Sequence, residues 1–254
     1  MGSELRLGAE FDARDDVPVA TAEALMSLGD AAEPRRFVGF VAIGDGRFHL
    51  KRYRYATWGE SLGLLGRGTF WGTAPELAEF EALQTLHEHG VPAVRPVAAC
   101  AITQHGRLVA HALLTEAAPA AAVDLETRLR DPADPLHQDR GRRRALMRRL
   151  GQTLARMHAI PFAHRDLRAR NILVAWEDGA NPALWLLDCR KGGAGRSDER
   201  ESDLASLDRD LRGRIPAGDR MTALRAYLAA GGDPKALVAR IARARADVPA
   251  PRAV

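Results

Sequence analysis

The pattern of hydrophobic and polar residues marks two neighbouring strand-like segments in the first half of the chain, one of them largely apolar and the other alternating between the two kinds of residue. One segment runs from Arg35 to Ile43 and the other from Phe48 to Tyr53, and the sequence Gly-Asp-Gly follows the first of them. Both segments are rich in residues that favour β-strands, and a short glycine-containing turn between two such segments predicts a β-hairpin. The second strand is expected to divide its side chains between two faces: Phe48, Leu50 and Arg52 on one, and His49, Lys51 and Tyr53 on the other.

A helical period replaces this alternation from Pro75 to His89. Apolar residues recur there every three or four positions, Pro75 suits the first turn of a helix, and Gly90 suits its end. The segment from Leu108 to Thr115 is again rich in strand-forming residues, and it is predicted to be a strand that ends at Glu116.

Helical periods dominate the second half of the chain. Beyond an alanine-rich stretch at 117–123, helices are predicted at 124–129, 140–158, 201–212, 220–230 and 234–246, with an apolar strand at 183–188. Because strands gather in the first half and helices in the second, the pattern predicts an α+β fold of two lobes. The expected division is a charged flexible arm at 1–20, a small antiparallel β-rich N-lobe at 21–116 and a helical C-lobe at 117–254, with the alanine-rich stretch as the hinge.

The balance of basic residues draws attention to one residue of the predicted hairpin. The 254 residues carry a formal net charge of +4, yet only three of the 37 basic residues are lysines, namely Lys51, Lys191 and Lys235. This chain uses arginine where positive charge alone is needed. A lysine inside a strand is therefore a candidate for a contact that requires a compact ammonium group.

The sequence has no segment typical of secretion or membrane insertion. Its first 20 residues are charged and contain no apolar core of a signal peptide, and no apolar run approaches the ~20 residues that a membrane span needs. Cys100 and Cys189 form neither a metal-binding spacing nor a disulfide framework, which is typical of reduced thiols. The expected location is the cytoplasm.

The strongest chemical signal is His164-Arg165-Asp166 followed by Asn171, which defines a candidate catalytic loop at 164–171. The Asp166 carboxylate can accept or orient the proton of an attacking hydroxyl, and the Asn171 amide can reach a divalent metal on nucleotide phosphates. Seventeen residues after Asn171, an apolar run ends at Asp188. A carboxylate at the end of a buried strand is unfavourable without a cation, so Asn171 and Asp188 are the predicted metal ligands.

This arrangement resembles that of protein-kinase-like enzymes. Their catalytic loop is similar to residues 164–171, Asp188 resembles their second metal ligand, and Lys51 resembles the strand lysine that contacts nucleotide phosphates. The resemblance implies a protein-kinase-like fold with ATP and Mg²⁺ as cofactors. It also implies that ATP binds between the two lobes, with its adenine beside residues 113–117, which makes Glu116 a candidate nucleotide-binding residue.

The same resemblance implies a helix glutamate that pairs with Lys51. Glu79 follows Lys51 by 28 residues and borders the apolar stripe of the predicted helix, and Glu76 lies on nearly the same face. Both glutamates are candidates. Glu79 is preferred because it precedes Leu83 and Leu86 by four and seven positions, which places it beside the buried stripe.

A narrower resemblance extends over residues 20–230. The order of "GVPAVRP", "LLTE", "DLETRL", "RMHAIPFAHRDL" and "LWLLDCRKGG" resembles the lipopolysaccharide core kinases, the heptose and Kdo kinases of Gram-negative bacteria. It implies transfer of the ATP γ-phosphate to a hydroxyl of a core sugar, on a glycolipid acceptor at the inner face of the cytoplasmic membrane. Asp166 would be catalytic, Arg168 and Arg170 would stabilise the transferred phosphate or bind an anionic acceptor, and Asp203 would anchor the catalytic loop.

Two features depart from the protein-kinase pattern. No GxGxxG phosphate loop precedes Lys51, which leaves residues 29–34 as a weak substitute, and Cys189-Arg190 follows Asp188 in place of Phe-Gly. Two alternatives therefore stay open. One is a kinase of the aminoglycoside or choline type, which the arginine-rich second half disfavours because such acceptors are cationic. The other is a binding protein that keeps the fold without catalysis.

A cluster of arginines marks the start of the long predicted helix. Its alternative interpretations are a solvated face and a peripheral contact with an anionic membrane or glycolipid. Nucleic acid is not expected as a partner, because no aromatic residues are interspersed with these arginines. The cluster consists of Arg140, Arg142, Arg143, Arg144, Arg148 and Arg149.

Overall fold

The computed structural model describes residues 2–8, 21–29, 35–55, 74–177, 181–232 and 234. Contacts within the chain divide it into two compact units. The first unit comprises Met1–Glu88 and Val94–Ala120, and the second comprises His89–Ala93 and Ala121–Val254. Strands dominate the first unit and helices the second, which confirms the α+β fold class expected from the sequence.

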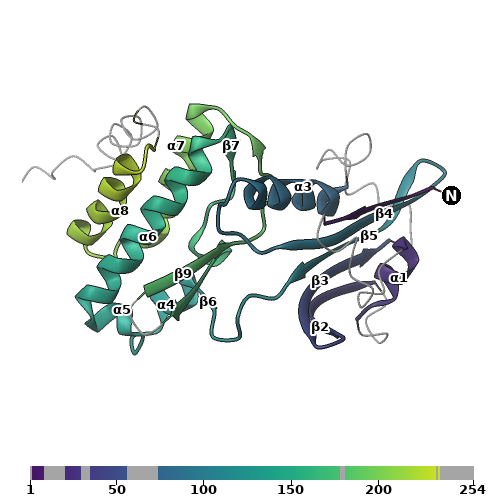
Figure 1. The fold of residues 1–254 in the computed structure, drawn as a ribbon, viewed down its shortest axis with the longest axis horizontal. Coiled ribbons are helices and arrows are strands. Elements are labelled where there is room, and N and C mark those ends of the chain that lie inside the picture. The colour runs from purple at the N-terminus through teal and green to yellow at the C-terminus, as the bar shows by residue number, and fades with distance from the viewer. Residues whose placement is uncertain are drawn as a thin grey trace, which may run out of the picture. The chain divides into compact units, whose positions relative to one another are not determined.

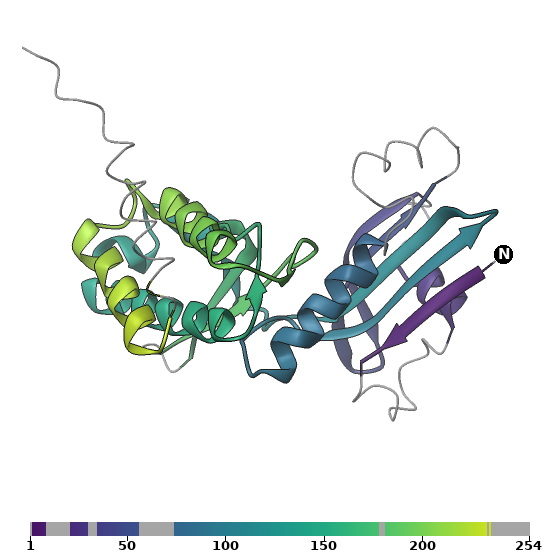
Figure 2. The ribbon, with the colours of Figure 1, turned by 90° about the horizontal axis from the view of Figure 1, so that it is seen from above.

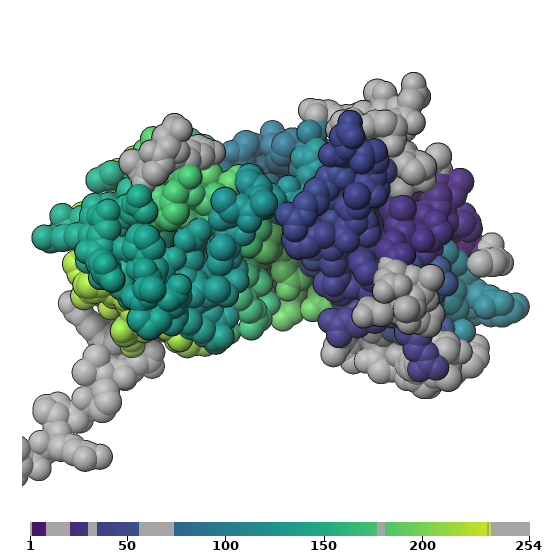
Figure 3. Space-filling model, turned by 90° about the horizontal axis from the view of Figure 1, so that it is seen from below, coloured from purple at the N-terminus to yellow at the C-terminus, as the bar shows by residue number. Residues whose placement is uncertain are grey.

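The first unit is built on a five-stranded antiparallel sheet with the strand order β1-β4-β5-β3-β2 (Figure 1). Strands β2 and β3 form the predicted hairpin, in which Ile43 pairs with Gly46 across a two-residue turn. Gly44 in that turn has a φ of 54°, a conformation that glycine adopts without strain. The hairpin lies at the surface of this unit (Figure 3). The strands are β1 (Gly2–Leu7), β2 (Arg36–Ile43), β3 (Gly46–Arg54), β4 (Pro96–Gln104) and β5 (Arg107–Glu116).

Two helices cover opposite faces of this sheet (Figure 2). Helix α1 (Ala22–Ser27) packs on the face that buries Phe48 and Leu50 of β3. Helix α3 (Pro75–Glu88) lies on the other face, which carries Lys51. The division of β3 into two faces is therefore as predicted, and it aims Lys51 at α3.

Helix α1 is held at both of its ends by side chains. The Thr21 hydroxyl accepts a hydrogen bond from a backbone N–H of the first turn, at 3.0 Å. At the other end, Arg52 donates to the carbonyl of Leu28 at 2.6 Å and Arg54 donates to that of Met26 at 2.7 Å. Carbonyl groups at a helix C-terminus attract cations, which explains why the strand keeps a buried arginine at position 52.

The prediction of a charged flexible arm at residues 1–20 is wrong for the first part of that segment. Residues 2–7 form β1, which pairs with β4 from Gly2↔Thr103 to Leu7↔Ala98. Leu5 and Leu7 alternate with charged residues and pack against the core beneath α1. Burial of these leucines and pairing along the edge of β4 give the segment a defined place despite its charges. Residues 9–20 lie outside the described part of the chain.

Helices form most of the second unit, together with a small three-stranded sheet in the order β6-β8-β9. A short helix, α5, lies between the predicted helices at 124–129 and 140–158, because Asp134 caps it and Pro135 suits its first position. The helices are α4 (Leu125–Arg130), α5 (Pro135–Gln138), α6 (Arg140–Ala159), α7 (Ser197–Leu211) and α8 (Ala217–Ala229), with a 3-10 turn, η2, at Ala169–Asn171. The strands are β6 (Val123–Asp124), β7 (Phe162–Ala163), β8 (Ile172–Glu177), β9 (Asn181–Leu186) and β10 (Gly193–Ala194).

Helices α6 and α8 pack side by side at very short range (Figures 1 and 2). A Cβ atom placed on Gly151 of α6 would lie 2.1 Å from the carbonyl oxygen of Ala223 and 2.9 Å from the backbone nitrogen of Tyr227. Backbone atoms of α8 cannot move away as a flexible side chain could. The absence of a side chain at position 151 therefore permits this close approach.

Replacing Gly151 with alanine should destabilise the protein by about 1–3 kcal/mol, because the added methyl group forces the two helices apart. For a chain of this size we expect the melting temperature to fall by roughly 3–10 °C. Gly218→Ala is a matched control, since Gly218 lies on α8 and no atom lies within 4 Å of a Cβ built there. If Gly151→Ala melts at the wild-type temperature, the close approach of the two helices is not required.

Two predicted features lie almost entirely outside the described residues. They are the weak candidate phosphate loop at 29–34, of which residue 29 is described, and the helix at 234–246, of which residue 234 is described. The other predicted helices and strands are present with bounds shifted by a few residues.

Candidate active site

Lys51 of β3 and Glu79 of α3 form an ion pair in the first unit. The Lys51 Nζ lies 2.8 Å from one carboxylate oxygen of Glu79 and 3.0 Å from the other. The Glu79 side chain is only 3% exposed, whereas that of Lys51 is 20% exposed. A buried carboxylate needs such a partner, and the ammonium group retains access to solvent. Of the two glutamates that the sequence left open, the structure brings Glu79 to Lys51.

Glu76, the rival glutamate of α3, is buried against a different partner. Its carboxylate lies against Nδ1 of His111 on β5. The Tyr55 hydroxyl lies 2.6 Å from the other ring nitrogen of His111, and the Tyr53 ring stacks on the same imidazole with 5.0 Å between centroids. This network gives Glu76 a structural explanation that the sequence analysis missed, because its members are far apart in the chain.

His49 shares the face of β3 that carries Lys51. Burial, together with the positive charge of Lys51, lowers the pKa of His49 below its ordinary value. The imidazole is therefore neutral at neutral pH, and it packs edge-on against the Phe40 ring with 5.4 Å between centroids. Because the His49 ring is uncharged, it does not compete with Lys51 for an anionic ligand.

The backbone fixes Glu116 at the end of β5. Its N–H donates to the carbonyl of Arg95 at 2.9 Å, and the next N–H, that of Ala117, donates to the carbonyl of Arg47 at 3.0 Å. The Glu116 carboxylate lies 3.7 Å from a guanidinium nitrogen of Arg95. These contacts show how the strand end is held, and the nucleotide-binding role of Glu116 stays a prediction.

In the second unit, Asp203 of α7 anchors the start of the loop at 164–171. One oxygen of its buried carboxylate accepts the backbone N–H of His164 at 2.7 Å, and the other accepts that of Arg165 at 2.8 Å. The His164 imidazole is buried as well, with Nε2 3.0 Å from the carbonyl of Leu187. Burial lowers the pKa of His164, so the ring is neutral. Its Nε2 carries the ring proton and donates a hydrogen bond to this carbonyl. His164 therefore holds the loop in place.

Arg165 links the candidate catalytic loop to the segment that follows Asp188. Its backbone has a φ of 61°, and its guanidinium donates to the carbonyls of Lys191 at 2.9 Å and Ala194 at 2.6 Å. It also forms a two-pronged ion pair with Glu199, at 2.7 and 3.1 Å. The hydrogen bonds from Arg165 lower the pKa of Glu199 to about 2. The link therefore stays ionised at any physiological pH.

Asp166 is the one acidic residue of the loop at 164–171. Its side chain is 26% exposed, and its carboxylate makes a long contact of 3.4 Å with Arg170. The backbone carbonyl of Asp166 accepts a hydrogen bond from the Asn171 amide nitrogen at 2.9 Å. This bond ties the two ends of the loop together and leaves the Asp166 carboxylate available to a substrate.

The β8–β9 hairpin brings Asn171 next to the residue that precedes Asp188. Ile172 pairs with Leu186, and the Leu187 N–H donates to the carbonyl of Asn171 at 2.9 Å. Asp188 itself has a φ of 53°, a rare conformation for a residue with a Cβ. Such outliers occur often at functional sites, where the surrounding structure holds them.

The donor atoms at this end of the hairpin suit magnesium. The Asn171 amide nitrogen is engaged by Asp166, so the amide oxygen faces the other way, and Asp188 adds carboxylate oxygens. Oxygen atoms of this kind are the ligands that Mg²⁺ prefers, and the ion usually takes the rest of its shell from phosphates and water. In the part of the chain that the structure describes, no group of three or more histidine, cysteine or acidic residues could hold a metal by itself.

Arg168, predicted to act in catalysis, lies in an ion pair with Asp210 of α7. Its guanidinium makes two bonds of 2.8 Å to the carboxylate, which also accepts the Ala169 N–H at 2.9 Å. Burial by itself would raise the pKa of Asp210, but the hydrogen bonds from Arg168 and Ala169 outweigh it and lower the pKa. These contacts position the loop, and a direct role for Arg168 in catalysis stays a prediction.

Helix α7 supports the loop with three carboxylates on one face. Glu199, Asp203 and Asp210 are spaced by four and seven residues, which places them within about 40° of each other around a helix. Each holds part of the loop, through Arg165, the His164 backbone or Arg168. The sequence analysis identified only Asp203. The helical spacing of the other two was the signal that could have found them.

The arginine cluster at the start of α6 has a partly structural explanation. Asp219 of α8 is buried and accepts Arg143 at 2.7 Å and Arg144 at 2.9 Å. Burial alone would raise the pKa of Asp219, but the hydrogen bonds from these two arginines lower it. Two of the six arginines are therefore committed to packing α8 against α6.

The described helices are too short or too polar to be candidates for a membrane span.

Comparison with known proteins places these residues in a family. The family described as "Lipopolysaccharide kinase (Kdo/WaaP) family" matches residues 27–227. The 3-deoxy-D-manno-octulosonic acid kinase of Vibrio parahaemolyticus serotype O3:K6 is 29% identical over 189 residues, which cover 72% of this chain and 71% of the relative. The enzyme of the same name from Vibrio vulnificus (strain YJ016) is 33% identical over 121 residues, which cover 48% of this chain and 45% of the relative. The chain thus spans about half the length of that curated relative.

A solved structure supports the fold. It is titled "WaaP in complex with acyl carrier protein", has a TM-score of 0.65 and is 19% identical in sequence, and the match covers 96% of this chain and 98% of that one. At this identity the similarity concerns the fold.

Proposed function

The chain belongs to the lipopolysaccharide kinase (Kdo/WaaP) family, and from this premise we propose that it transfers the γ-phosphate of ATP to a hydroxyl of a lipopolysaccharide core sugar. Curated relatives are named for 3-deoxy-D-manno-octulosonic acid, so this sugar is the first acceptor to consider and a heptose is the second. The cofactors are ATP and Mg²⁺.

One observation carries the proposal: an accessible carboxylate, Asp166, shares its loop with Asn171, and the strand that leads to Asp188 pairs beside that loop, so that two oxygen donors suited to magnesium accompany it. The Asn171 amide nitrogen bonds the Asp166 carbonyl, and the hairpin register seats Asn171 beside Leu187, the residue before Asp188. A loop that only stabilised the fold would have no need of an exposed carboxylate beside a strained aspartate. Phosphoryl transfer uses both, one at the attacking hydroxyl and one at the metal.

In the proposed reaction, Asp166 orients the acceptor hydroxyl and takes its proton. The hydroxyl oxygen forms a bond to the γ-phosphorus, the bond from that phosphorus to the β–γ bridging oxygen breaks, and ADP leaves with the electron pair. Asn171 and Asp188 would hold Mg²⁺, which when bound neutralises charge on the phosphates. Arg170, 3.4 Å from Asp166, would be near the phosphate that is transferred.

The first unit would contribute the groups that bind the nucleotide. The Lys51 ammonium would contact phosphate oxygens, and Glu79 would keep it in position through its two short contacts. Glu116, at the end of β5, would lie beside the adenine. Arg168, held by Asp210, would position the loop and the phosphate acceptor together.

The proposed acceptor is a sugar attached to a lipid, and a lipid-linked acceptor lies in a membrane. The reaction would therefore take place at a membrane surface. We expect the protein to meet this glycolipid at the inner face of the cytoplasmic membrane as a peripheral protein. ATP is available on that side.

The test is the melting temperature with and without magnesium and ATP. A ligand at one hundred times its Kd adds ~2.7 kcal/mol, which for a chain of this size raises the melting temperature by roughly 5–10 °C. We expect this rise for wild type only when both Mg²⁺ and ATP are present. Asp188→Ala should abolish it, and Asp198→Ala, an exposed aspartate on α7, should retain it.

Two outcomes would overturn the proposal. If saturating Mg²⁺ and ATP do not raise the melting temperature of wild type, the chain is a binding protein that keeps the fold without a nucleotide. If Asp188→Ala responds as wild type does, the magnesium ligands are assigned wrongly.

A further inference from the structure

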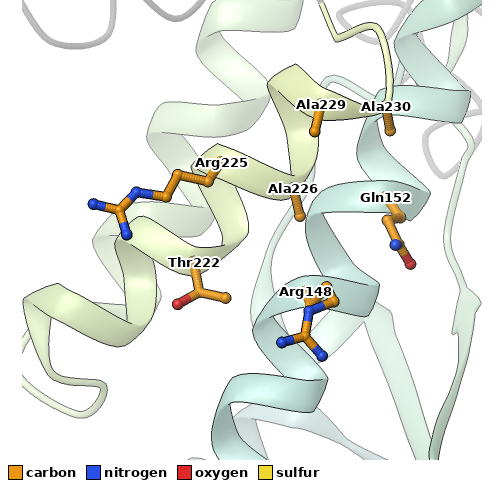
Figure 4. Close-up of a pocket in the computed structure, with 7 residues that line it drawn as sticks. All are labelled: Arg148, Gln152, Thr222, Arg225, Ala226, Ala229 and Ala230. Carbon is orange, nitrogen blue, oxygen red and sulfur yellow. The ribbon is translucent and has the colours of Figure 1, made fainter.

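Helices α6 and α8 form an exposed surface, which we call the α6–α8 face. Between the helices lies an open groove of about 360 Å³, lined by Arg148 and Gln152 of α6, by Thr222 and Arg225 of α8 and by three alanines of α8 (Figure 4). The alanines leave the floor of the groove shallow and apolar. The four polar side chains at its rim include two arginines and no acid.

Two large apolar side chains project from α8 next to this groove. Met221 is 44% exposed and Leu228 is 42% exposed, and of the large apolar residues described in the second unit these are the two that are exposed. Arg225 follows Met221 by four residues and precedes Leu228 by three, so the three share one face of the helix. An apolar–basic–apolar stripe of this kind has no role in packing α8 on α6, which uses Tyr227 and the backbone opposite Gly151.

Positive charge on this face is not neutralised within the described part of the chain. Arg148 and Arg156 of α6 and Arg225 of α8 make no ion pair there, whereas Arg143 and Arg144 are paired with Asp219. Helix α6 contains no acidic residue over its 20 positions, and Asp219 is the one acidic residue of α8. The α6–α8 face therefore combines three uncompensated arginines with two exposed apolar side chains.

We propose that the α6–α8 face docks on the surface of an anionic lipid bilayer. Met221 and Leu228 enter the boundary between head groups and acyl chains, and Arg148, Arg156 and Arg225 contact lipid phosphates. Exposed apolar residues flanked by arginine are the composition of helices that lie in a membrane interface. Each basic residue near an anionic surface contributes separately to binding. The proposal rests on the proposed function in one respect, that a lipid-linked acceptor gives the protein a reason to bind a bilayer.

The geometry favours an extended surface over a single anion. In Figure 4 the guanidinium groups of Arg148 and Arg225 extend in different directions and do not converge on one point. The apolar residues beside them have no use in binding a free phosphate. Nucleic acid would require aromatic side chains for stacking, and the aromatic residue of α8, Tyr227, is buried.

The experiment measures binding of the full chain to sedimented vesicles, without ATP or sugar. Vesicles of phosphatidylcholine alone are compared with vesicles that also contain phosphatidylglycerol. We expect binding to the anionic vesicles only, weakening as salt is added. The variant Arg148→Gln/Arg156→Gln/Arg225→Gln should lose roughly 100-fold in affinity, about fivefold for each arginine. Met221→Ser/Leu228→Ser should also bind more weakly, although it keeps every charge.

A matched control removes the same charge elsewhere in the second unit. Arg130→Gln/Arg196→Gln/Arg209→Gln changes three exposed arginines, one in α4, one in α7 and one at the N-cap of α7. It should bind within about threefold of wild type because distant charges are screened. An equal loss in both triple variants would show that net charge alone attracts the protein and would overturn the proposal. Wild type that binds polyglutamate but not anionic vesicles would assign the face to an acidic protein and would also overturn it.

Activity measurements separate this inference from the proposed function. On a soluble, deacylated acceptor the face variants should turn over at the wild-type rate, and on an acceptor embedded in vesicles they should lose activity in parallel with binding. Vesicle binding through this face in a protein that phosphorylates no sugar would refute the proposed function and leave the inference standing. Full activity on vesicles by a variant that no longer binds them would refute the inference alone.

Discussion

Asp166→Asn is expected to lower turnover about 100- to 10,000-fold, the range found when a general base is removed. The melting temperature and its rise with magnesium and ATP should stay at their wild-type values, because the Asp166 carboxylate makes one long contact with Arg170 and supports no other part of the fold. The measurement is the initial rate of phosphate transfer to a 3-deoxy-D-manno-octulosonic acid acceptor, with kcat and KM determined separately.

The physical reason lies in the contrast between Asp166 and the other carboxylates around the loop. The Asp203 carboxylate accepts hydrogen bonds from two backbone N–H groups. The Asp210 carboxylate accepts from Arg168 and from the Ala169 N–H. The Glu199 carboxylate accepts from two nitrogen atoms of the Arg165 guanidinium. Asp166 is 26% exposed and is free to receive a substrate proton. An asparagine keeps the shape of the side chain and removes its basicity, so the change tests the chemistry and leaves the packing intact.

Asp198→Asn is the matched control for this experiment, since it removes an exposed carboxylate near the loop that supports only a surface pair with Arg196. Its kcat should equal that of wild type. Should Asp166→Asn also retain the wild-type kcat, the catalytic assignment would be wrong. A loss of nucleotide binding in Asp166→Asn would instead indicate that Asp166 belongs to the metal site.

Asp203→Ala is expected to destabilise the protein by about 2–4 kcal/mol, because the N–H groups of His164 and Arg165 lose their carboxylate acceptor. At this chain length the melting temperature should fall by roughly 4–15 °C. Activity should fall as well, since the His164 and Arg165 backbones would no longer be fixed beside Asp166. Thermal unfolding and the rate of phosphate transfer are measured on the same preparation.

A graded series distinguishes an anchor from a group that takes part in chemistry. Asp203→Asn retains one acceptor oxygen, so both its stability and its activity should lie between those of wild type and Asp203→Ala. Activity that vanishes in Asp203→Asn while the melting temperature is unchanged would give Asp203 a direct role in the reaction. Wild-type stability in Asp203→Ala would show that the two N–H groups find other partners.

Local pattern was sufficient for much of the first unit. Two runs of strand-forming residues around a glycine turn predicted the β2–β3 hairpin. The period of two predicted the face of β3 on which Lys51 lies, because side chains of a strand alternate whatever surrounds them. The same pattern in Leu5 and Leu7 was overlooked, since the charges of residues 1–20 suggested an arm. Only pairing with β4 made that short segment a strand.

In the candidate site, too, the sequence predicted some features and tertiary contacts decided others. The types and spacing of Asp166, Asn171 and Asp188 were enough to predict a phosphotransfer loop, because that chemistry needs a carboxylate and hard oxygen donors at fixed separations. The sequence also placed Glu76 and Glu79 on nearly the same helix face, and it preferred Glu79 from its position beside the apolar stripe without identifying the partner of either glutamate. The choice was made by β5, which supplies His111 to Glu76, and by β3, which supplies Lys51 to Glu79.

Roles of charged residues depended most on tertiary structure. Six arginines at the start of one helix look alike in the sequence, yet Arg143 and Arg144 hold a buried aspartate, while Arg148 faces an open groove. The sequence by itself determined which chemical groups this protein has and on which side of each strand or helix they lie, because backbone geometry repeats with a fixed period. Which groups are neutralised and which stay available to a ligand was decided only by the packing of α7 and α8, because ion pairs join residues that the chain separates by tens of positions.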